Sequence, residues 1–166
     1  GAIWADVSTG NSHTCGLKND GTLWCWGSNG YGQCGHNQDS TTPRAVDAGG
    51  PWTSVSAGFN HTCATKIDGT LWCWGQNLNG ELGDGTTTYG RWTPAQVGQV
   101  DGGPGWSGVG GGYAHTCGVR TDGTMWGWGD NTTGQLGDGT TVRKESPVQV
   151  DAGADWTQVA AGGNHS

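Results

Sequence analysis

Apolar and polar residues alternate in short runs that recur along the chain. The clearest run is Leu-Trp-Cys-Trp-Gly at residues 23–27, preceded by His-Thr-Cys-Gly-Leu at residues 13–17. Nearly the same stretch returns at 61–75 and at 115–129, and a further copy begins at 164–166. Short alternating runs without a helical period predict β-strands. The chain is therefore expected to be all-β and built from repeats.

A Trp opens each repeat, and successive copies are 48, 54 and 50 positions apart: Trp4, Trp52, Trp106 and Trp156. Each unit holds four short stretches of strand character, separated by turn residues. A unit of about fifty residues with four strands is typical of one blade of a β-propeller. The expected units are residues 1–51, 52–105 and 106–155, followed by the start of a fourth at 156–166.

Both faces of the third predicted strand are apolar, because Leu23 and Cys25 point to one side and Trp24 and Trp26 to the other. Such a sheet is stable only when a neighbour covers each side. Three complete blades are fewer than the four to eight of typical propellers. We therefore expect a partial propeller that belongs to a longer protein or closes a ring by self-association. The partial fourth unit favours the longer protein.

The turn between the second and third predicted strands sets their register. Asn-Asp-Gly at 19–21 suits a three-residue hairpin loop with Gly in the left-handed conformation. Cys15 then faces Cys25 at a non-hydrogen-bonded pair, where the side chains approach closely enough for a disulfide. A two-residue loop would instead place Trp26 opposite Cys15. The equivalent pair in the second unit is Cys63 and Cys73.

Two cysteines have no partner in this register. Cys117 faces Gly127, and Cys34 stands where the other units have Leu. A bridge between them is geometrically unfavourable because their units are not adjacent, so we expect small buried hydrophobic residues. The two paired sets favour an oxidising compartment and thus a secreted or cell-surface protein. Reduced, buried cysteines in a cytosolic protein are the alternative.

The amino-acid composition and net charge of the chain limit the kinds of partner that we expect it to bind. The chain has 35 Gly and 11 Trp, and its formal net charge is −7. The seven basic residues form no cluster or stripe, so nucleic acid is not expected as a partner. No apolar run approaches the roughly 20 residues needed to cross a bilayer, so membrane insertion is not expected either.

Residues 55–86 follow the pattern Val-x-Ala-Gly-x-x-His-x-Cys, Asp-Gly-Thr-Leu-Trp-Cys-Trp-Gly-x-Asn and Gly-x-Leu-Gly-Asp-Gly-Thr, and residues 109–140 follow it with small departures. This pattern resembles the regulator of chromosome condensation repeat. The resemblance covers essentially the whole chain and implies blades of a seven-bladed propeller. The family includes a nuclear exchange factor for a small GTPase, non-catalytic binding platforms and a secreted bacterial inhibitor of β-lactamases. The cysteine pairs point to a secreted, bacterial-type member or a fragment of one.

The residues that could carry chemistry are repeated ones. We expect the repeated His to make the same structural hydrogen bond in each unit, with a metal-binding ring as the alternative: His13, His61, His115 and His165. Asp84 and Asp138 are expected in tight turns, and one carboxylate per loop is too few for calcium. No nucleophile motif is present. We therefore expect no catalytic activity and no cofactor.

Residues that differ between the units are free to bind. One variable position lies two residues before each His, in the turn that leaves the first strand, and another zone is the long loop of each unit. Exposed aromatic and Arg side chains at such places are typical of interfaces, whereas packing over blade edges is the structural alternative. The candidate binding residues are Tyr31, Phe59, Tyr89, Arg91, Trp92, Tyr113, Arg143 and Lys144.

The sequence thus predicts a non-catalytic extracellular propeller module for protein–protein or surface interaction. Its expected partner is a protein, or a component of the cell surface or extracellular space. The main alternative is a carbohydrate-binding propeller, in which an exposed Trp or Tyr stacks on sugar rings. An enzyme inhibitor or a guanine-nucleotide exchange factor is a weaker alternative.

Overall fold

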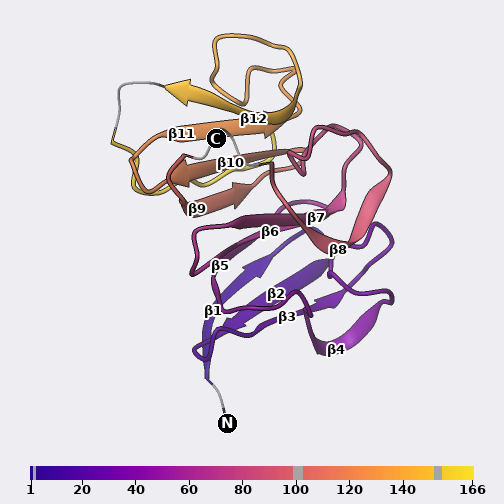
Figure 1. Cartoon of the computed structure of the whole chain (residues 1–166). Coiled ribbons are helices and arrows are strands. Elements are labelled where there is room, and N and C mark those ends of the chain that lie inside the picture. Colours follow the sequence, from indigo (N-terminus) through magenta and orange to yellow (C-terminus); the bar gives the residue numbers. More distant parts are fainter. Residues whose placement is uncertain (2, 99–102, 152–154) are drawn as a thin grey trace.

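The structure is a computed structural model that describes residues 1, 3–98, 103–151 and 155–166. Within these residues the chain forms strands and no helix. The strands group into three four-stranded antiparallel sheets, in each of which strands consecutive in sequence are neighbours. The sheets stack face to face from the N-terminal to the C-terminal part of the chain (Figure 1). This arrangement confirms an all-β chain of propeller blades.

The first sheet holds β1 (Trp4–Thr9), β2 (His13–Lys18), β3 (Leu23–Gly27) and β4 (Ser40–Ala45). The second sheet holds β5 (Trp52–Ala57), β6 (His61–Lys66), β7 (Leu71–Gln76) and β8 (Gly90–Gln96). The third sheet holds β9 (Trp106–Gly111), β10 (His115–Arg120), β11 (Met125–Gly129) and β12 (Lys144–Asp151). In the stack, β5 packs against β1 and β2, and β9 packs against β5 and β6.

The predicted hairpin register is confirmed. Gly21 has φ +80°, its N–H donates to the Lys18 carbonyl, and the Lys18 N–H donates to Thr22 across the loop. This three-residue loop places Cys15 opposite Cys25, with Cα atoms 4.1 Å apart and a disulfide between them. Cys63 and Cys73 form the same bridge in the second sheet.

The two remaining cysteines are free and fully buried. Cys117 pairs with Gly127 in the sheet register, as predicted, and the Cys34 thiol lies 3.4 Å from the Ser28 carbonyl. Burial raises the pKa of Cys34 to about 12. These thiols therefore stay protonated at neutral pH and pack as small apolar side chains.

Removal of the second bridge offers a test of what the disulfides contribute. Replacing both Cys63 and Cys73 by Ala is expected to lower the free energy of unfolding by about 2–3 kcal/mol, because the bridge restricts a short loop in the unfolded chain. Urea denaturation of this variant and of the wild type measures the difference. Cys117→Ala is the matched control, since its hairpin has no bridge, and it should cost less. Equal losses would contradict the entropic role of the bridge.

Tryptophans fill the space between the sheets. Trp74 is fully buried, its ring centroid lies 5.9 Å from that of Trp52, and its Nε1–H donates to the Gln33 carbonyl of the preceding blade at 3.0 Å. Trp128 repeats this contact with Glu81. The apolar face of one blade is therefore covered by the next blade, as the doubly apolar strands predicted.

A cation lies between two Trp rings at the end of each sheet that carries the Asp-Gly turn. Lys18 Nζ is 5.0 Å from the Trp4 ring centroid and 3.8 Å from that of Trp24. The other two sheets repeat this with Lys66 between Trp52 and Trp72, and with Arg120 between Trp106 and Trp126. Three basic residues thus serve packing within the blades through cation–π contacts.

The C-terminal residues continue the repeat pattern without an assigned strand. The Trp156 N–H donates to the Gly123 carbonyl, as the Trp52 N–H does to Gly21. The Gly162 N–H donates to the His165 carbonyl, which repeats the bond from Gly10 to His13. Among the described residues no helix has the length and apolar character to span a bilayer.

Candidate binding surface

The repeated His joins each blade to the next. His13 Nε2 lies 2.8 Å from Thr62 Oγ1, and that hydroxyl donates to the Gln33 carbonyl at 2.8 Å. Because the Thr proton is directed at the carbonyl, the imidazole carries its proton on Nε2 and donates to the hydroxyl oxygen. His61 and His115 repeat the arrangement with Thr116 and Ser166. The predicted structural hydrogen bond is confirmed for His13, His61 and His115.

These imidazoles lie in an environment that disfavours charge. His13 and His61 are 3% and 0% exposed, and Nδ1 has no hydrogen-bond partner among the described residues. Burial lowers the pKa of His13 to about 4 and that of His61 to about 3. The described residues contain no group of three or more His, Cys, Asp or Glu side chains that could hold a metal ion.

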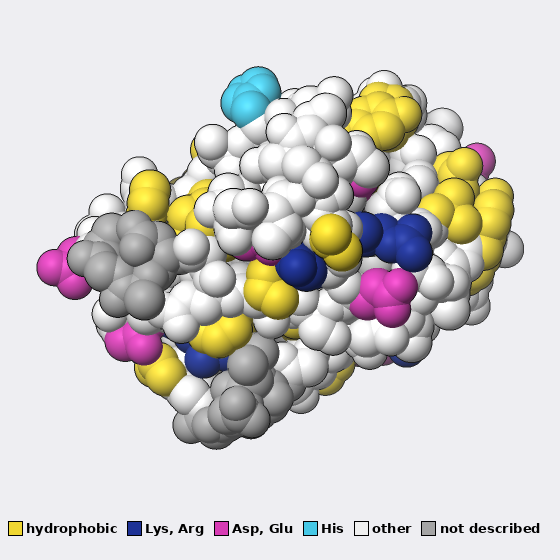
Figure 2. Space-filling model, turned by 90° about the horizontal axis from the view of Figure 1, so that it is seen from above, with side chains coloured by type: hydrophobic (Ala, Val, Ile, Leu, Met, Phe, Trp, Pro, Cys, Tyr) yellow, Lys and Arg dark blue, Asp and Glu magenta, His cyan; other side chains and the backbone are white. Residues whose placement is uncertain are grey.

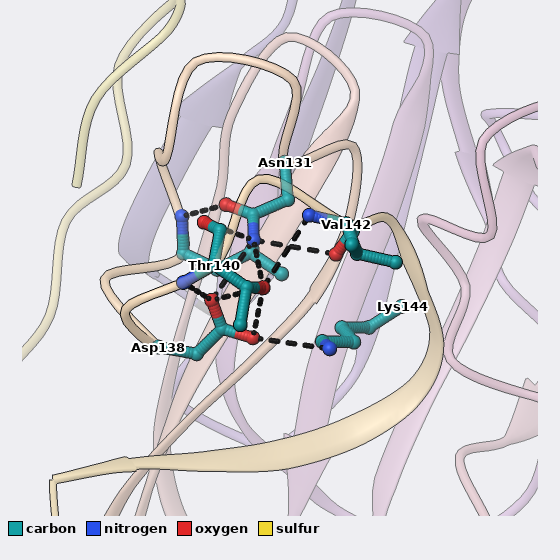
Figure 3. Close-up of polar contacts among 6 residues, drawn as sticks. Asn131, Asp138, Thr140, Val142 and Lys144 are labelled. Carbon is teal, nitrogen blue, oxygen red and sulfur yellow. Dashed lines mark hydrogen bonds and ion pairs between the residues drawn. The ribbon is translucent and has the colours of Figure 1, made fainter.

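An Asn side chain organises the long loop of each blade, and Figure 3 shows the one in the third blade. Asn131 is fully buried, its Nδ2 donates to Asp138 Oδ1 at 2.9 Å and to the Thr140 carbonyl, and its Oδ1 accepts from the Leu136 N–H. Burial disfavours the Asp138 charge, yet hydrogen bonds from Thr140, Asn131 and Lys144 lower its pKa to about 2. These carboxylates hold turns, as predicted for Asp84 and Asp138.

The two variable zones of the sequence lie at the same end of the blades. The turn before β6 meets the start of the loop after β7, because His61 pairs with Gly75 and the Gln76 N–H donates to the Asn60 carbonyl. The loops after β3 and β7 lie on the right of the stack in Figure 1, away from the Asp-Gly turns. The candidate residues therefore share one end of the molecule.

Three of the candidate aromatics form a continuous group, which we call the aromatic cluster: Tyr31, Tyr89 and Trp92. The ring centroids of Tyr31 and Tyr89 are 5.0 Å apart, and those of Tyr89 and Trp92 are 6.5 Å apart with an interplanar angle of 21°. Tyr89 is 59% exposed and Trp92 is 37% exposed. The cluster joins the loop of the first blade to the outer strand of the second.

A glycine brings these two elements together. Gly32 has φ +86°, and a Cβ built on it would lie 2.6 Å from the Trp92 Cα atom and 2.4 Å from the Arg91 carbonyl oxygen. The loop of the first blade therefore rests directly on the backbone of β8. A side chain at this position would force the loop away and separate Tyr31 from Tyr89.

The next blade boundary lacks an aromatic cluster. Asn79 occupies the loop position of Tyr31, and Val142 occupies the position of Tyr89, counted back from Arg91 and Lys144, which pair with equivalent glycines. Val142 is 62% exposed, so the position itself faces solvent in both blades. The cluster is thus a feature of one boundary and not of the repeat.

Phe59 and Tyr113 form a separate pair in the turns that leave the first strands. Their ring centroids are 4.3 Å apart, and Tyr113 is 52% exposed. A shallow hollow of about 230 Å³ lies beside them, lined by glycine-rich turns and by Asn11. The structure therefore divides the predicted aromatics into two groups at the same end.

The predicted basic residues surround the loop 77–86. Arg91 Nε lies 2.9 Å from Asp84 Oδ2, and Arg143 lies 3.4 Å from Glu145. Lys144 lies 3.3 Å from the nearly buried Asp138 carboxylate. Basic and hydrophobic side chains lie next to one another on the face drawn in Figure 2, together with acidic ones. Of the three basic residues, Lys144 therefore contributes most to the fold, through its ion pair with Asp138.

Comparison with known proteins places the fold among propellers. Human WBSCR16 superposes with a TM-score of 0.87 at 24% identity, covering 98% of this chain and 43% of that chain. Prp20p of Saccharomyces cerevisiae superposes with a TM-score of 0.84 at 23% identity, covering 96% of this chain and 42% of that chain. At identities of 23–24%, the structural similarity is evidence for a shared fold alone.

Sequence relatives are found among much longer proteins. Human E3 ubiquitin-protein ligase HERC2 is 32% identical over 164 residues, which is 95% of this chain and 3% of that protein. The ultraviolet-B receptor UVR8 of Arabidopsis thaliana is 40% identical over 60 residues, which is 35% of this chain and 14% of that protein. The chain spans a small part of the length of these relatives.

Two sequence families with the same description match along the chain. One matches residues 20–65, 68–119 and 122–166, and the other matches residues 4–33, 52–81 and 106–135. The matched segments include every hairpin and inter-blade His described above. The chain belongs to the family of the regulator of chromosome condensation (RCC1) repeat.

Proposed function

We propose that this chain is part of a β-propeller that binds another protein and catalyses no reaction itself. The observation that carries the proposal is the aromatic cluster: three rings at positions that do not repeat meet across one blade boundary, and two of them, Tyr89 and Trp92, stay exposed. Buried aromatic anchors dominate protein interfaces, and exposed rings of this kind are rare without a partner. Prp20p, which has a similar fold, has binding properties to Gsp1p and histones.

The proposed setting is extracellular or on the cell surface. Two disulfides lie in the cores of their blades with fully buried sulfurs. Such bridges persist in oxidising compartments and are rare in the cytosol. Mass spectrometry of the native protein without reducing agent tests this point, since unbridged Cys15 and Cys63 would remove its support.

The geometry supports a protein partner better than a carbohydrate. A sugar ring stacks on an open aromatic face, whereas Tyr31 and Tyr89 lie 5.0 Å apart at 30° and partly cover each other. The covered faces are closed to a sugar ring, and the exposed ring edges suit side chains of a protein. The carbohydrate alternative is kept as an outcome of the test.

A photo-crosslinking amino acid at position 89 tests the proposal. We expect it to capture a specific protein, and we expect Trp92→Ala in the same chain to reduce capture roughly tenfold, as for a hot-spot residue. Position 142 is the matched control, because Val142 is the equivalent exposed residue of the third blade.

Three results would contradict the proposal. Equal capture of the same proteins from positions 89 and 142 would mean that the cluster has no special role. Glycan-array binding that is lost in Trp92→Ala would support the carbohydrate alternative instead. Crosslinking to a second copy of this chain would support self-association.

A further inference from the structure

One cation that is not used in packing between Trp rings, Arg91, is the sequence neighbour of Trp92 in the aromatic cluster. Of the seven basic residues, three lie between Trp rings within the blades. The other four lie on the outermost strands or directly before one: Arg44 on β4, Arg91 on β8, and Arg143 and Lys144 at the start of β12. Lys144 neutralises the Asp138 carboxylate, which is 8% exposed.

Arg91 presents an open guanidinium group. Its Nε–H bonds to Asp84, and its two Nη groups have no hydrogen-bond partner among the described residues. The Arg91 side chain is 44% exposed, whereas that of Asp84 is only 9% exposed and accepts hydrogen bonds from Asn77 and Thr86 as well. The solvent-facing member of this ion pair is therefore the cation.

Arg143 adds a second cation across the same loop. Its side chain is 44% exposed and lies 3.4 Å from the Glu145 carboxylate, whose side chain is 45% exposed. The neighbouring Gly85 N–H donates to the Glu145 carbonyl, so Arg143 and Arg91 approach the loop 77–86 from two blades. Exposed pairs of this kind hold each other weakly and can exchange partners.

Strand β8 carries both Arg91 and one ring of the aromatic cluster, Trp92. Arg91 and Trp92 are consecutive residues of this strand, so their side chains leave opposite faces of the sheet. β8 is the edge strand of its sheet, with mostly exposed residues. An extended segment laid along this edge would contact rings on one side and a guanidinium group on the other.

The other end of the blades has the opposite character. The Asp-Gly turns there expose Asp20, Asp68 and Asp122, and the cations beside them lie between Trp rings. In an acidic chain of net charge −7, an acidic partner would be repelled from that end. We therefore expect the end with the Asp-Gly turns to repel an acidic partner, and the end with Arg91 and Arg143 to attract one.

We propose that the partner segment is an extended acidic peptide that lies along the edge of β8, with apolar or proline side chains on the aromatic cluster and a carboxylate on Arg91 and Arg143. Arginine recognises carboxylates through paired N–H groups, and aromatic surfaces bind apolar and proline side chains. This inference rests on the proposed function and specifies the chemistry of its partner.

Selection from a library of random peptides of about twelve residues tests the inference without a known ligand. The full 166-residue chain serves as the target. We expect enriched peptides to combine Asp or Glu with Pro, Leu or aromatic residues. Their affinity should fall roughly tenfold in Arg91→Ala/Arg143→Ala and in Trp92→Ala, as for hot-spot contacts. Rising salt should weaken binding to the wild type more than to the double Arg variant.

Matched variants separate this site from the rest of the surface. Arg44→Ala and Ile67→Ala remove an exposed cation and an exposed apolar side chain elsewhere, and they should leave the affinity unchanged. A Glu→Lys version of the best peptide should bind Arg91→Glu/Arg143→Glu better than it binds the wild type. This charge exchange has a readout that a folding defect cannot imitate.

The inference is overturned if no peptide is enriched, if enriched peptides carry no acidic residue, or if the Arg variants bind them as the wild type does. It also fails if a sulfated or uronic-acid glycan binds the cluster and displaces the peptides. If position 89 still captures a protein in any of these cases, the proposed function stands. If it captures none, the proposed function fails as well.

Discussion

Trp74→Ala is expected to lower the free energy of unfolding by about 3–5 kcal/mol, which is the usual cost of emptying the site of a large buried aromatic side chain. Trp74 is fully buried between two blades and contacts Trp52. Its loss also removes the N–H that the Gln33 carbonyl accepts, although that carbonyl keeps its bond from Thr62. Urea denaturation followed by circular dichroism measures the change.

Trp26→Ala is the matched control for this variant. Trp26 occupies the same position in the first blade, but it is only half-buried in this chain and contacts Trp4 at 6.0 Å. We expect its loss to cost clearly less than that of Trp74, because Trp26 is only half-buried among the described residues whereas Trp74 is fully buried. Equal costs for the two variants would show that the Trp stabilises its own sheet and not the contact between blades.

Acidification from pH 7 to pH 4 is expected to destabilise the fold before its carboxylates are protonated. The ordinary pKa of His is 6.5, and burial lowers it to about 4 in His13 and about 3 in His61. Below pH 6.5 the unfolded chain binds protons that the native chain does not, so stability falls as pH falls and levels off near the native pKa values. The loss expected by pH 4 is about 3 kcal/mol for each His, because pH 4 lies roughly 2.5 units below the ordinary pKa and each unit is worth about 1.4 kcal/mol.

Denaturation midpoints measured at several pH values between 7 and 4 test this prediction. His61→Gln should flatten the dependence on pH, because Gln does not titrate in this range. The raised pKa of Glu81, caused by burial, acts in the opposite direction, and the lowered pKa of Asp138 acts in the same direction at a lower pH. A midpoint that is constant between pH 6.5 and 4 would contradict the role of the buried His.

Much of each blade could be predicted from the residues that repeat. The Asn-Asp-Gly loop gave the correct register, and the register gave the correct cysteine pairs, because the partners lie only 10 positions apart in the chain. The repeated His was correctly interpreted as structural. Its partner, a Thr of the next blade, was not predicted, because it lies 49 positions away on another sheet.

Comparison of the repeats identified the candidate binding residues. It did not predict which of them contact one another. Tyr31 and Tyr89 come from the long loops of different units, and the sequence predicted no contact between them. The signal that could have joined them is Gly32, whose missing side chain lets the loop rest on β8. No feature of the sequence indicated that Phe59 and Tyr113 would form a pair separate from the aromatic cluster.

The sequence by itself determined the fold class, the repeat, the strand register and the two disulfides, since these follow from turns and alternation within short stretches of chain. Only the tertiary structure decided which residues of neighbouring blades meet. It placed Tyr31 against Tyr89, turned the Arg91 guanidinium to solvent above a nearly buried Asp84, and committed Lys144 to Asp138. These contacts depend on how one sheet stacks on the next, and a pattern local to one blade contains no information about that distance or orientation.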